Sequence, residues 1–179
     1  SSNRNRLVCS YNSGGDRMIY FYNIHNKGAI LDKGLGIESR DGSPACGWDL
    51  WTEMMRDSSK FKPEYFKYYS CVATINCETP AEAFHLTNSE EAFAYNHLHG
   101  NPVTPLTGSG TIPSMSVGDI VLVNDEFWMC KGEGWELLEG LTAERAESMK
   151  KTEALRYVLL KEYEYEKEYY NEHYNKGGE

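Results

Sequence analysis

Residues 114–138 constrain the fold more than any other part of the chain, because short apolar runs alternate there with tight-turn residues. Gly118 and Asp119 are expected to turn the chain into a strand, and Asn124–Asp125 is a typical two-residue hairpin turn. The pattern predicts three strands, at residues 120–123, 126–130 and 135–138. Strands joined by such short connections pair antiparallel, so the sequence predicts an antiparallel sheet.

The chain before this segment predicts further short strands. Residues 68–76 form the clearest strand, and residues 18–24 form a strand with apolar side chains on both faces, which indicates cover on each side. The strand at 18–24 is expected to form a hairpin with residues 7–11, and residues 29–31 are another short strand. The segment 100–116 is rich in proline and glycine and is expected to be an exposed loop.

Three short helices are also expected. Residues 48–56 carry apolar side chains at helical spacing, a stripe typical of core packing. The stripe consists of Trp48, Trp51, Met54 and Met55. Thr79 as N-cap and Pro80 at the first helical position predict a helix over residues 81–87, completed by a glutamate three residues after the cap. A third helix is expected over residues 89–98.

The C-terminal region differs from the rest of the chain. Residues 142–174 contain neither proline nor glycine, so they can form one helix on the order of 50 Å long. The first half is expected to pack on the domain, and the second half, rich in Glu, Lys and Tyr, to project or to pair with another chain. Tyrosine is a frequent interface anchor. The candidate contacts on this helix are Tyr163, Tyr170 and Tyr174.

These elements predict an α+β fold: a small, mainly antiparallel sheet built from hairpins, short helices packed on it, and a long C-terminal helix. A length of 179 residues suits one compact domain, expected over residues 3–140, with the charged helix over residues 141–176 as an appendage. No run of about 18 apolar residues occurs, so no membrane span is expected. Five cysteines without a tight repeat fit free thiols in a reducing compartment.

The net charge of −9 is concentrated in the middle of the chain. Residues 71–140 contain ten acidic side chains and one basic side chain, Lys131, whereas residues 1–70 contain eight acids and ten bases. A negatively charged surface repels nucleic acid and attracts a basic protein. The alternative interpretation is that a net charge of this size only keeps a small protein soluble. The sequence therefore predicts an acidic interaction face formed by Glu78, Glu90, Glu91, Asp119, Asp125, Glu126, Glu133 and Glu136.

No motif in the sequence identifies a catalytic or metal-binding site. A nucleophile elbow, a phosphate-binding glycine loop and a Cys/His set at zinc spacing are all missing. Cys46 precedes a helix start, where a thiolate is favoured, but an incidental thiol is the better interpretation. We therefore predict no catalytic residues, no metal and no cofactor, and a role other than catalysis is favoured. As an alternative, the sequence predicts a ligand pocket with His97, His99, Asp119 and Trp128 as its candidate lining residues.

An ordered set of motifs runs through residues 68–138. It comprises Ala83-Phe84-x-Leu86-Thr87-Asn88, then Asn96, a Pro/Gly-rich loop, Ser-x-Ser-Val-Gly-Asp at 114–119 and Gly134–Trp135. This order resembles a group of small accessory proteins encoded by tailed bacteriophages, a group without an assigned activity. The resemblance implies a phage or prophage origin, expression in a bacterial cytoplasm and a dispensable accessory role.

Three functions are compatible with the sequence. The favoured one is a phage accessory protein that binds a host protein with a basic surface, in host takeover or as an anti-defence inhibitor. Its acidic face would present carboxylates in place of DNA phosphates, and direct binding to nucleic acid is not expected. The alternatives are a small-molecule or nucleotide-binding protein or enzyme, and a self-assembling structural protein that forms a homodimer through the C-terminal helix.

Overall fold

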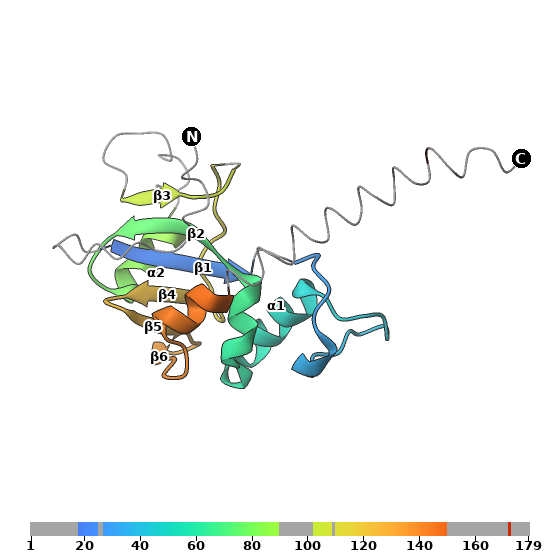
Figure 1. The fold of residues 1–179 in the computed structure, drawn as a ribbon. Coiled ribbons are helices and arrows are strands. Elements are labelled where there is room, and N and C mark those ends of the chain that lie inside the picture. The colour runs from blue at the N-terminus through green and yellow to red at the C-terminus, as the bar shows by residue number, and fades with distance from the viewer. Residues whose placement is uncertain (1–17, 25–26, 90–101, 109, 150–171, 173–179) are drawn as a thin grey trace, which may run out of the picture.

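The computed structural model of the chain describes residues 18–24, 27–89, 102–108, 110–149 and Glu172. They contain a six-stranded sheet in the order β3-β2-β1-β4-β5-β6, in which every neighbouring pair is antiparallel (Figure 1). The strands are β1 (Met18–Ile24), β2 (Tyr69–Asn76), β3 (Val103–Pro105), β4 (Ile120–Val123), β5 (Glu126–Cys130) and β6 (Trp135–Leu137). The helices are η2 (Lys33–Leu35), α1 (Gly47–Arg56), η3 (Ser58–Lys60), η4 (Pro63–Tyr68) and α2 (Pro80–Asn88). The predicted α+β class and antiparallel sheet are confirmed.

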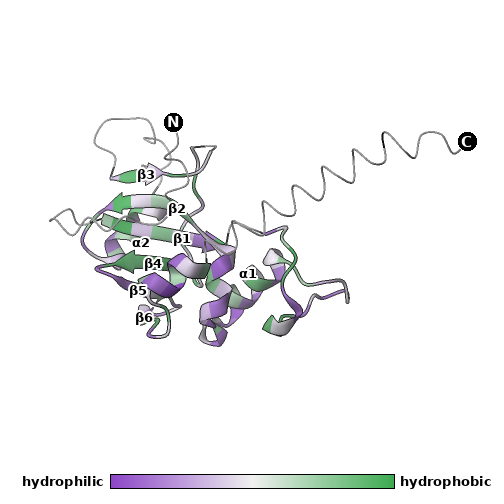
Figure 2. Cartoon of the chain, in the orientation of Figure 1, coloured by the Kyte–Doolittle hydropathy of each residue, from purple (hydrophilic) through white to green (hydrophobic). Residues whose placement is uncertain are grey.

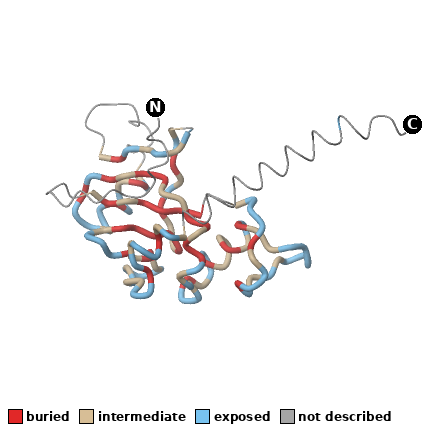
Figure 3. Tube along the Cα trace, in the orientation of Figure 1, coloured by how far each residue is buried: buried red, intermediate tan, exposed pale blue. Residues whose placement is uncertain are grey.

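Helices cover the sheet on both faces. On one face Phe21 of β1 packs in a cluster with Ala83 of α2. On the opposite face Phe127 of β5 packs with Phe66 of η4, with α1 and with a helix at residues 143–149. Figure 2 shows the apolar colour concentrated in the central strands, and Figure 3 shows that most of β1 and β4 and half of β2 are buried. The core is therefore two apolar clusters separated by the sheet.

The strand β1 lies near the middle of this sheet. It pairs with β2 along its length and with β4 through residues 20–22. Ile19 and Phe21 are buried on the α2 side, and Ile24 is buried on the other side, so the prediction of cover on each face is confirmed. Residues 7–11, the predicted hairpin partner, lie outside the described residues.

Two local signals in the sequence are confirmed by the backbone. The hydroxyl of Thr79 accepts the backbone N–H of Glu82 at 3.2 Å, and Pro80 is the first residue of α2. Asn124 and Asp125 have φ values of 48° and 67°, the left-handed pair that a type I′ hairpin turn requires. Both residue types tolerate this conformation better than most, which explains why the turn follows β4 directly.

The prediction that residues 100–116 form an exposed loop is wrong in part. The segment contributes β3 at the edge of the sheet, and Val103, Ile112 and Met115 are buried in the cluster beneath α2. The Asn76 N–H donates to the Pro102 carbonyl at 2.8 Å, which aligns the segment with β2. An edge strand tolerates proline because one side of it needs no N–H donors.

The helix predicted around Trp48 is confirmed as α1, but the predicted core stripe is only partly correct. Leu50 and Met54 are fully buried, whereas Trp48 is 53% exposed and Met55 is 38% exposed. The helix turns its Leu50 side toward the sheet, so Trp48 and Met55 lie beside the buried face. The Lys27 ammonium lies 4.8 Å from the Trp48 ring centroid, a cation–π contact that partly covers the exposed ring.

Two segments form secondary structure that the sequence does not predict. The predicted strand at residues 29–31 is reduced to a single bridge between Ile30 and Cys46. No element is predicted at η4, yet Tyr65 and Phe66 of this 3-10 helix are buried in the core. The Phe66 ring stacks on Tyr69 at a centroid distance of 6.0 Å, so η4 supplies aromatic cover that sequence periodicity does not indicate.

The helix at residues 143–149 begins after Thr142, whose hydroxyl accepts the Arg145 N–H at 3.2 Å. Leu141 and Ala146 are buried against the sheet, which fixes this helix on the domain. The remainder of the predicted C-terminal helix, apart from Glu172, lies outside the described residues. Among the residues that the structure describes, no helix has the length and apolar character needed to cross a membrane.

Candidate functional site

A groove of about 670 Å³ lies beside the end of the sheet where β4 turns into β5 and the chain leaves β6. Four of its lining residues are acidic and exposed, namely Asp125, Glu126, Glu139 and Glu144. We refer to it as the acidic groove, defined by these four residues. Its apolar lining residues are Phe127, Leu137, Leu138, Leu141 and Ala143, and Thr142 completes it.

The antiparallel register brings these residues together. The tight turn after β4 leaves Glu126 at the first position of β5. The Leu138 N–H donates to the Phe127 carbonyl at 2.8 Å, so the chain that continues to Glu139 passes the same end of the sheet. A short turn then leads into the helix at 143–149, which places Glu144 in its first turn. The groove is therefore built from a hairpin, a strand end and a helix start.

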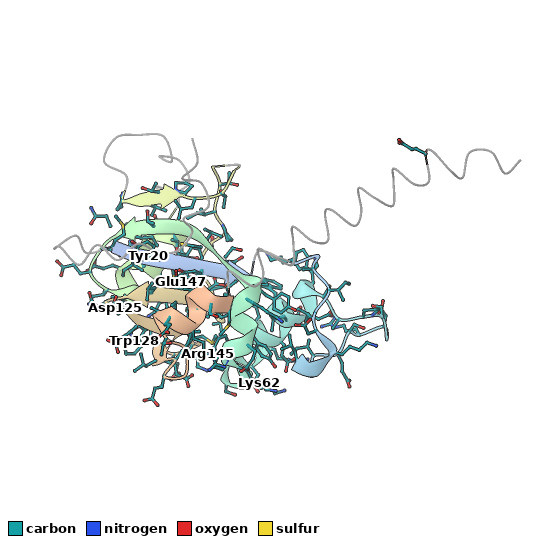
Figure 4. The ribbon with its side chains drawn as sticks, viewed as in Figure 1. Tyr20, Lys62, Asp125, Trp128, Arg145 and Glu147 are labelled. Carbon is teal, nitrogen blue, oxygen red and sulfur yellow. The ribbon has the colours of Figure 1, made fainter. Side chains whose placement is uncertain are left out.

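The lining of the acidic groove contains four acids and no base. Among the described residues, none of the four groove acids forms an ion pair. Arg145 belongs to the same helix as Glu144. Its guanidinium contacts Glu64 at 2.7 Å and donates to the Gly140 carbonyl, next to Glu139, at 3.1 Å, and Figure 4 shows it apart from Asp125. Because four exposed carboxylates in one groove repel one another, a cation entering the groove would relieve that repulsion.

Only part of the predicted acidic face is brought together. Asp125 and Glu126 lie in the acidic groove. Glu133 lies in the turn after β5, at the opposite end of that strand and thus roughly 15 Å away. Glu136 is on β6, where its carboxylate pairs with the Lys131 ammonium at 2.6 Å. The predicted acids therefore divide into a concentrated group at one end of β5 and dispersed or paired residues elsewhere.

The other acids of the predicted face are Glu78, Glu90 and Glu91. Glu78 is exposed just after β2, at the same end of the sheet as Asp125 and separated from it by β1. Glu90 and Glu91 lie outside the described residues. Glu78 therefore lies at this end of the sheet without lining the groove.

Asp119 is buried, which removes it from both the predicted acidic face and the predicted pocket. Only 2% of the residue is exposed. Its Oδ1 accepts the side-chain amide of Asn23 at 2.9 Å, and its Oδ2 accepts the backbone N–H of Ser116 at 2.9 Å. The turn at residues 116–119 folds back onto β1, and the carboxyl group ties the two together. Its role is structural.

The predicted ligand pocket is not assembled by the described residues. Trp128 packs in the cluster on the α2 side of the sheet and does not line the acidic groove. His97 and His99 lie outside the described residues, as do the helix tyrosines Tyr163, Tyr170 and Tyr174. Among the residues that are described, no three His, Cys, Asp or Glu side chains are placed to hold a metal ion.

A second groove, of about 630 Å³, adjoins the first. It shares Thr142 and Glu144 with the acidic groove and is otherwise lined by Glu64, Lys67, Arg145, Ser148 and Met149. Two acids and two bases make its formal charge zero. The lining on the β5–β6 side of the helix at 143–149 is therefore the more negative of the two.

Sequence reasoning misses two residues of the acidic groove. Glu139 belongs to the acidic middle segment but follows the last predicted strand, so no pattern connects it to Asp125. Glu144 lies in the first turn of a helix, where an acidic side chain interacts favourably with the helix dipole. Its presence there has a structural explanation and does not by itself indicate a functional site. Their proximity to Asp125 and Glu126 depends on the register of β5 with β6, which the sequence does not specify.

The buried thiols are expected to resist alkylation. Burial raises the pKa of both Cys77 and Cys130 to about 11. A rise of about two units lowers the thiolate fraction roughly a hundredfold at neutral pH. Iodoacetamide should therefore label the half-exposed Cys46 of the native protein well before Cys77 and Cys130, as measured by peptide mass spectrometry. Equal labelling of Cys130 and Cys46 in native protein would contradict this burial, and labelling in urea provides the control.

Comparison with known proteins adds no relative. No protein-family model matches the chain, and neither a curated protein nor a solved structure matches it.

Proposed function

We propose that this protein is a phage-encoded accessory protein that binds a host protein through the acidic groove. The partner is expected to carry a basic segment, and the outcome of binding is host takeover or inhibition of a defence system. The phage setting and the bacterial cytoplasm rest on the resemblance carried by residues 68–138. The binding mode rests on the groove itself.

The observation that carries the proposal is that carboxylates and apolar side chains line the same groove. Asp125, Glu126, Glu139 and Glu144 line it together with Leu137 and other apolar residues. An apolar centre with a charged rim is the usual arrangement of a protein interface. The charge selects a basic partner and accelerates its approach, while the apolar residues contribute most of the affinity. Carboxylates in this arrangement can also take the place of DNA phosphates for a nucleic-acid-binding enzyme.

The C-terminal helix is a second proposed contact. If residues 141–176 continue the helix that begins after Thr142, Tyr163, Tyr170 and Tyr174 supply aromatic anchors beyond the domain. The same helix is the proposed route to a homodimer in the structural-protein alternative. The alternative of a small-molecule site has no support from Asp119, whose carboxyl oxygens are already occupied by Asn23 and Ser116.

Neutralising the groove is expected to weaken binding to a basic partner. The variant Glu126→Gln/Glu139→Gln should bind a lysine-rich peptide about fivefold more weakly than the original protein, because two exposed charge contacts contribute about 1 kcal/mol together. Isothermal titration calorimetry at low salt measures the difference. Added salt should reduce it, because exposed charges are screened.

The matched control is Glu38→Gln/Glu133→Gln. Both side chains are exposed and lie outside the groove, and each double variant changes the net charge from −9 by two units, to −7. The control should bind like the original protein. If both double variants lose the same affinity, net charge alone drives binding and the groove has no special role. The same variants used as baits in a bacterial lysate should differ in the proteins that they retain.

A further inference from the structure

The two edges of the sheet differ in whether they can accept another strand. β3 forms one edge and β6 forms the other, at the top and bottom of the sheet in Figure 1. An edge strand presents unpaired N–H and C=O groups that can pair with an added strand, and proteins commonly block such edges with proline or charge. The register of each edge strand shows which of its groups point outward.

The edge at β3 is closed by proline. Asn76 N–H donates to the Pro102 carbonyl and Leu106 N–H donates to the Val72 carbonyl. Pairs alternate between bonded and non-bonded positions in an antiparallel ladder, so Val103 and Pro105 direct their backbone outward. Pro105 has no N–H, and an added strand would lack a donor at that position.

The edge at β6 is open. Lys131 N–H donates to the Gly134 carbonyl and Leu138 N–H donates to the Phe127 carbonyl. By the same alternation, Glu136 pairs inward with β5, and Trp135 and Leu137 direct N–H and C=O groups away from the sheet. None of these four outward groups has a hydrogen-bond partner among the described residues.

The open edge continues into the acidic groove. Leu137 belongs both to β6 and to the groove lining, and Glu139 follows two residues later. Trp135 and Leu137 are half-buried on one face of β6, and Glu136 is exposed on the other. A strand lying along this edge would therefore meet apolar side chains on one face, the Glu136–Lys131 ion pair on the other, and the groove carboxylates at its end.

We propose that β6 accepts an extended segment of the partner protein as a seventh strand, with alternating apolar and basic side chains, so that its Lys or Arg residues reach the acidic groove. The inference rests on the proposed function and specifies its binding mode. Backbone hydrogen bonds to Trp135 and Leu137 contribute affinity, and the alternation of side chains contributes specificity, as in other cases of strand addition.

A short peptide of alternating lysine and valine is the probe. Amide hydrogen exchange followed by NMR should show that the Trp135 and Leu137 N–H groups become protected when the peptide binds. The N–H of Glu136, which faces β5, should not change. Two further peptides, N-methylated at odd or at even positions, test the pairing directly, because only one set of N–H groups can face β6. One of them should lose at least about tenfold in affinity, and the other should bind like the parent.

A protein variant gives the complementary test. Leu137→Pro removes an outward N–H and leaves the β5–β6 ladder intact, so it should lower the affinity for the peptide about tenfold. Leu137→Ala removes the same side chain but keeps the N–H, so it should lower the affinity less than Leu137→Pro does, and the difference between the two variants measures the backbone hydrogen bond. A thermal melt of Leu137→Pro checks that it is folded, and the N-methylated peptides require no protein variant.

The outcomes separate the two proposals. Binding that is weakened by Glu126→Gln/Glu139→Gln but unaffected by N-methylation at either set of positions would overturn strand addition and leave the acidic groove as the binding site. Unchanged exchange of the Trp135 and Leu137 amides in the bound state would overturn it as well. No binding of the peptide to the original protein at low salt would overturn both.

Discussion

Alanine at position 118 is expected to lower the free energy of unfolding by about 3 kcal/mol, a large fraction of the stability of a small domain. Gly118 has a φ of +91°, a conformation in which a side chain is strained. A Cβ atom at this position would lie 2.9 Å from Met54 Cβ and 3.0 Å from the Met54 backbone carbonyl. Helix α1 would have to move away from the sheet to accommodate it.

The surroundings of Gly118 prevent an easy adjustment. Its N–H donates to the Cys130 carbonyl at 2.9 Å, and its carbonyl accepts the hydroxyl of Tyr69 at 2.7 Å. Tyr69 is fully buried, so its hydroxyl has no water to replace a lost partner. A shift of the turn that relieved the clash with Met54 would therefore cost buried hydrogen bonds.

Gly36→Ala is the matched control for this prediction. Gly36 also has a positive φ, +72°, but a Cβ atom at this position would have no other atom within 4 Å. Only the backbone strain of about 1 kcal/mol applies there. Urea denaturation followed by circular dichroism measures both variants. If the two alanine variants have the same midpoint, the close approach of α1 to Gly118 does not contribute to stability.

The Ser-Val-Gly-Asp motif is thus explained by packing. Gly118 lets α1 approach the turn, and Asp119 joins the turn to β1 through Asn23 and Ser116. The sequence correctly predicts that the motif turns the chain into a buried strand, because glycine and aspartate before an apolar run are typical turn residues. It does not show that Asp119 is buried, because an aspartate beside a glycine is usually on the surface.

Elements with strong local signals could be predicted and elements that depend on distant partners could not. β4, β5 and the cap of α2 follow from turn chemistry and side-chain alternation over a few residues. β3 is three residues long and contains a proline, so only its pairing with β2 defines it. The central position of β1 likewise depends on pairing with β4, about a hundred residues later in the chain.

The candidate site illustrates the same limit. Asp125 and Glu126 are adjacent in sequence, and the charge pattern predicts both as interaction residues. Glu139 and Glu144 join them only through the return of β6 along β5 and the turn into the following helix. A charge count locates the acidic segment but not its distribution in space, which is why Glu133 and Glu136 fall outside the groove.

Burial of Asp119 predicts an unusual dependence of stability on pH. Burial raises the pKa of this carboxyl group to about 7, although the hydrogen bonds from Ser116 and Asn23 and the charge of Lys27 act in the opposite direction. In the unfolded chain the group has an ordinary pKa of about 3.9. Between these two values the folded protein holds a proton that the unfolded chain has released.

The sign of the effect follows from this difference. Where the folded state binds more protons, the free energy of unfolding decreases as the pH rises. The contribution of Asp119 is therefore fully present below about pH 4, falls by about 1.4 kcal/mol per pH unit through the interval, and is lost above about pH 7. Most structural carboxyl groups have lowered pKa values and act in the opposite direction.

Asp119→Asn isolates this contribution, because every other titrating group is common to the variant and the original protein. Asparagine has the same shape and does not ionise, and a rotated Asn23 amide can accept a hydrogen bond from the new side-chain amide. The variant should therefore gain stability relative to the original protein, by on the order of 2 kcal/mol, as the pH rises from about 5 to about 8. Urea denaturation of both proteins at each pH measures the difference, and a difference that stays constant over this interval would show that the carboxyl group titrates alike in the folded and unfolded chains.

The exposed Asp41 is the opposite case, since hydrogen bonds from Ser43 lower the pKa of its carboxyl group, so Asp41→Asn should not reproduce the gain. An increase confined to Asp119→Asn would assign the effect to burial of one carboxyl group at the junction of the turn with β1.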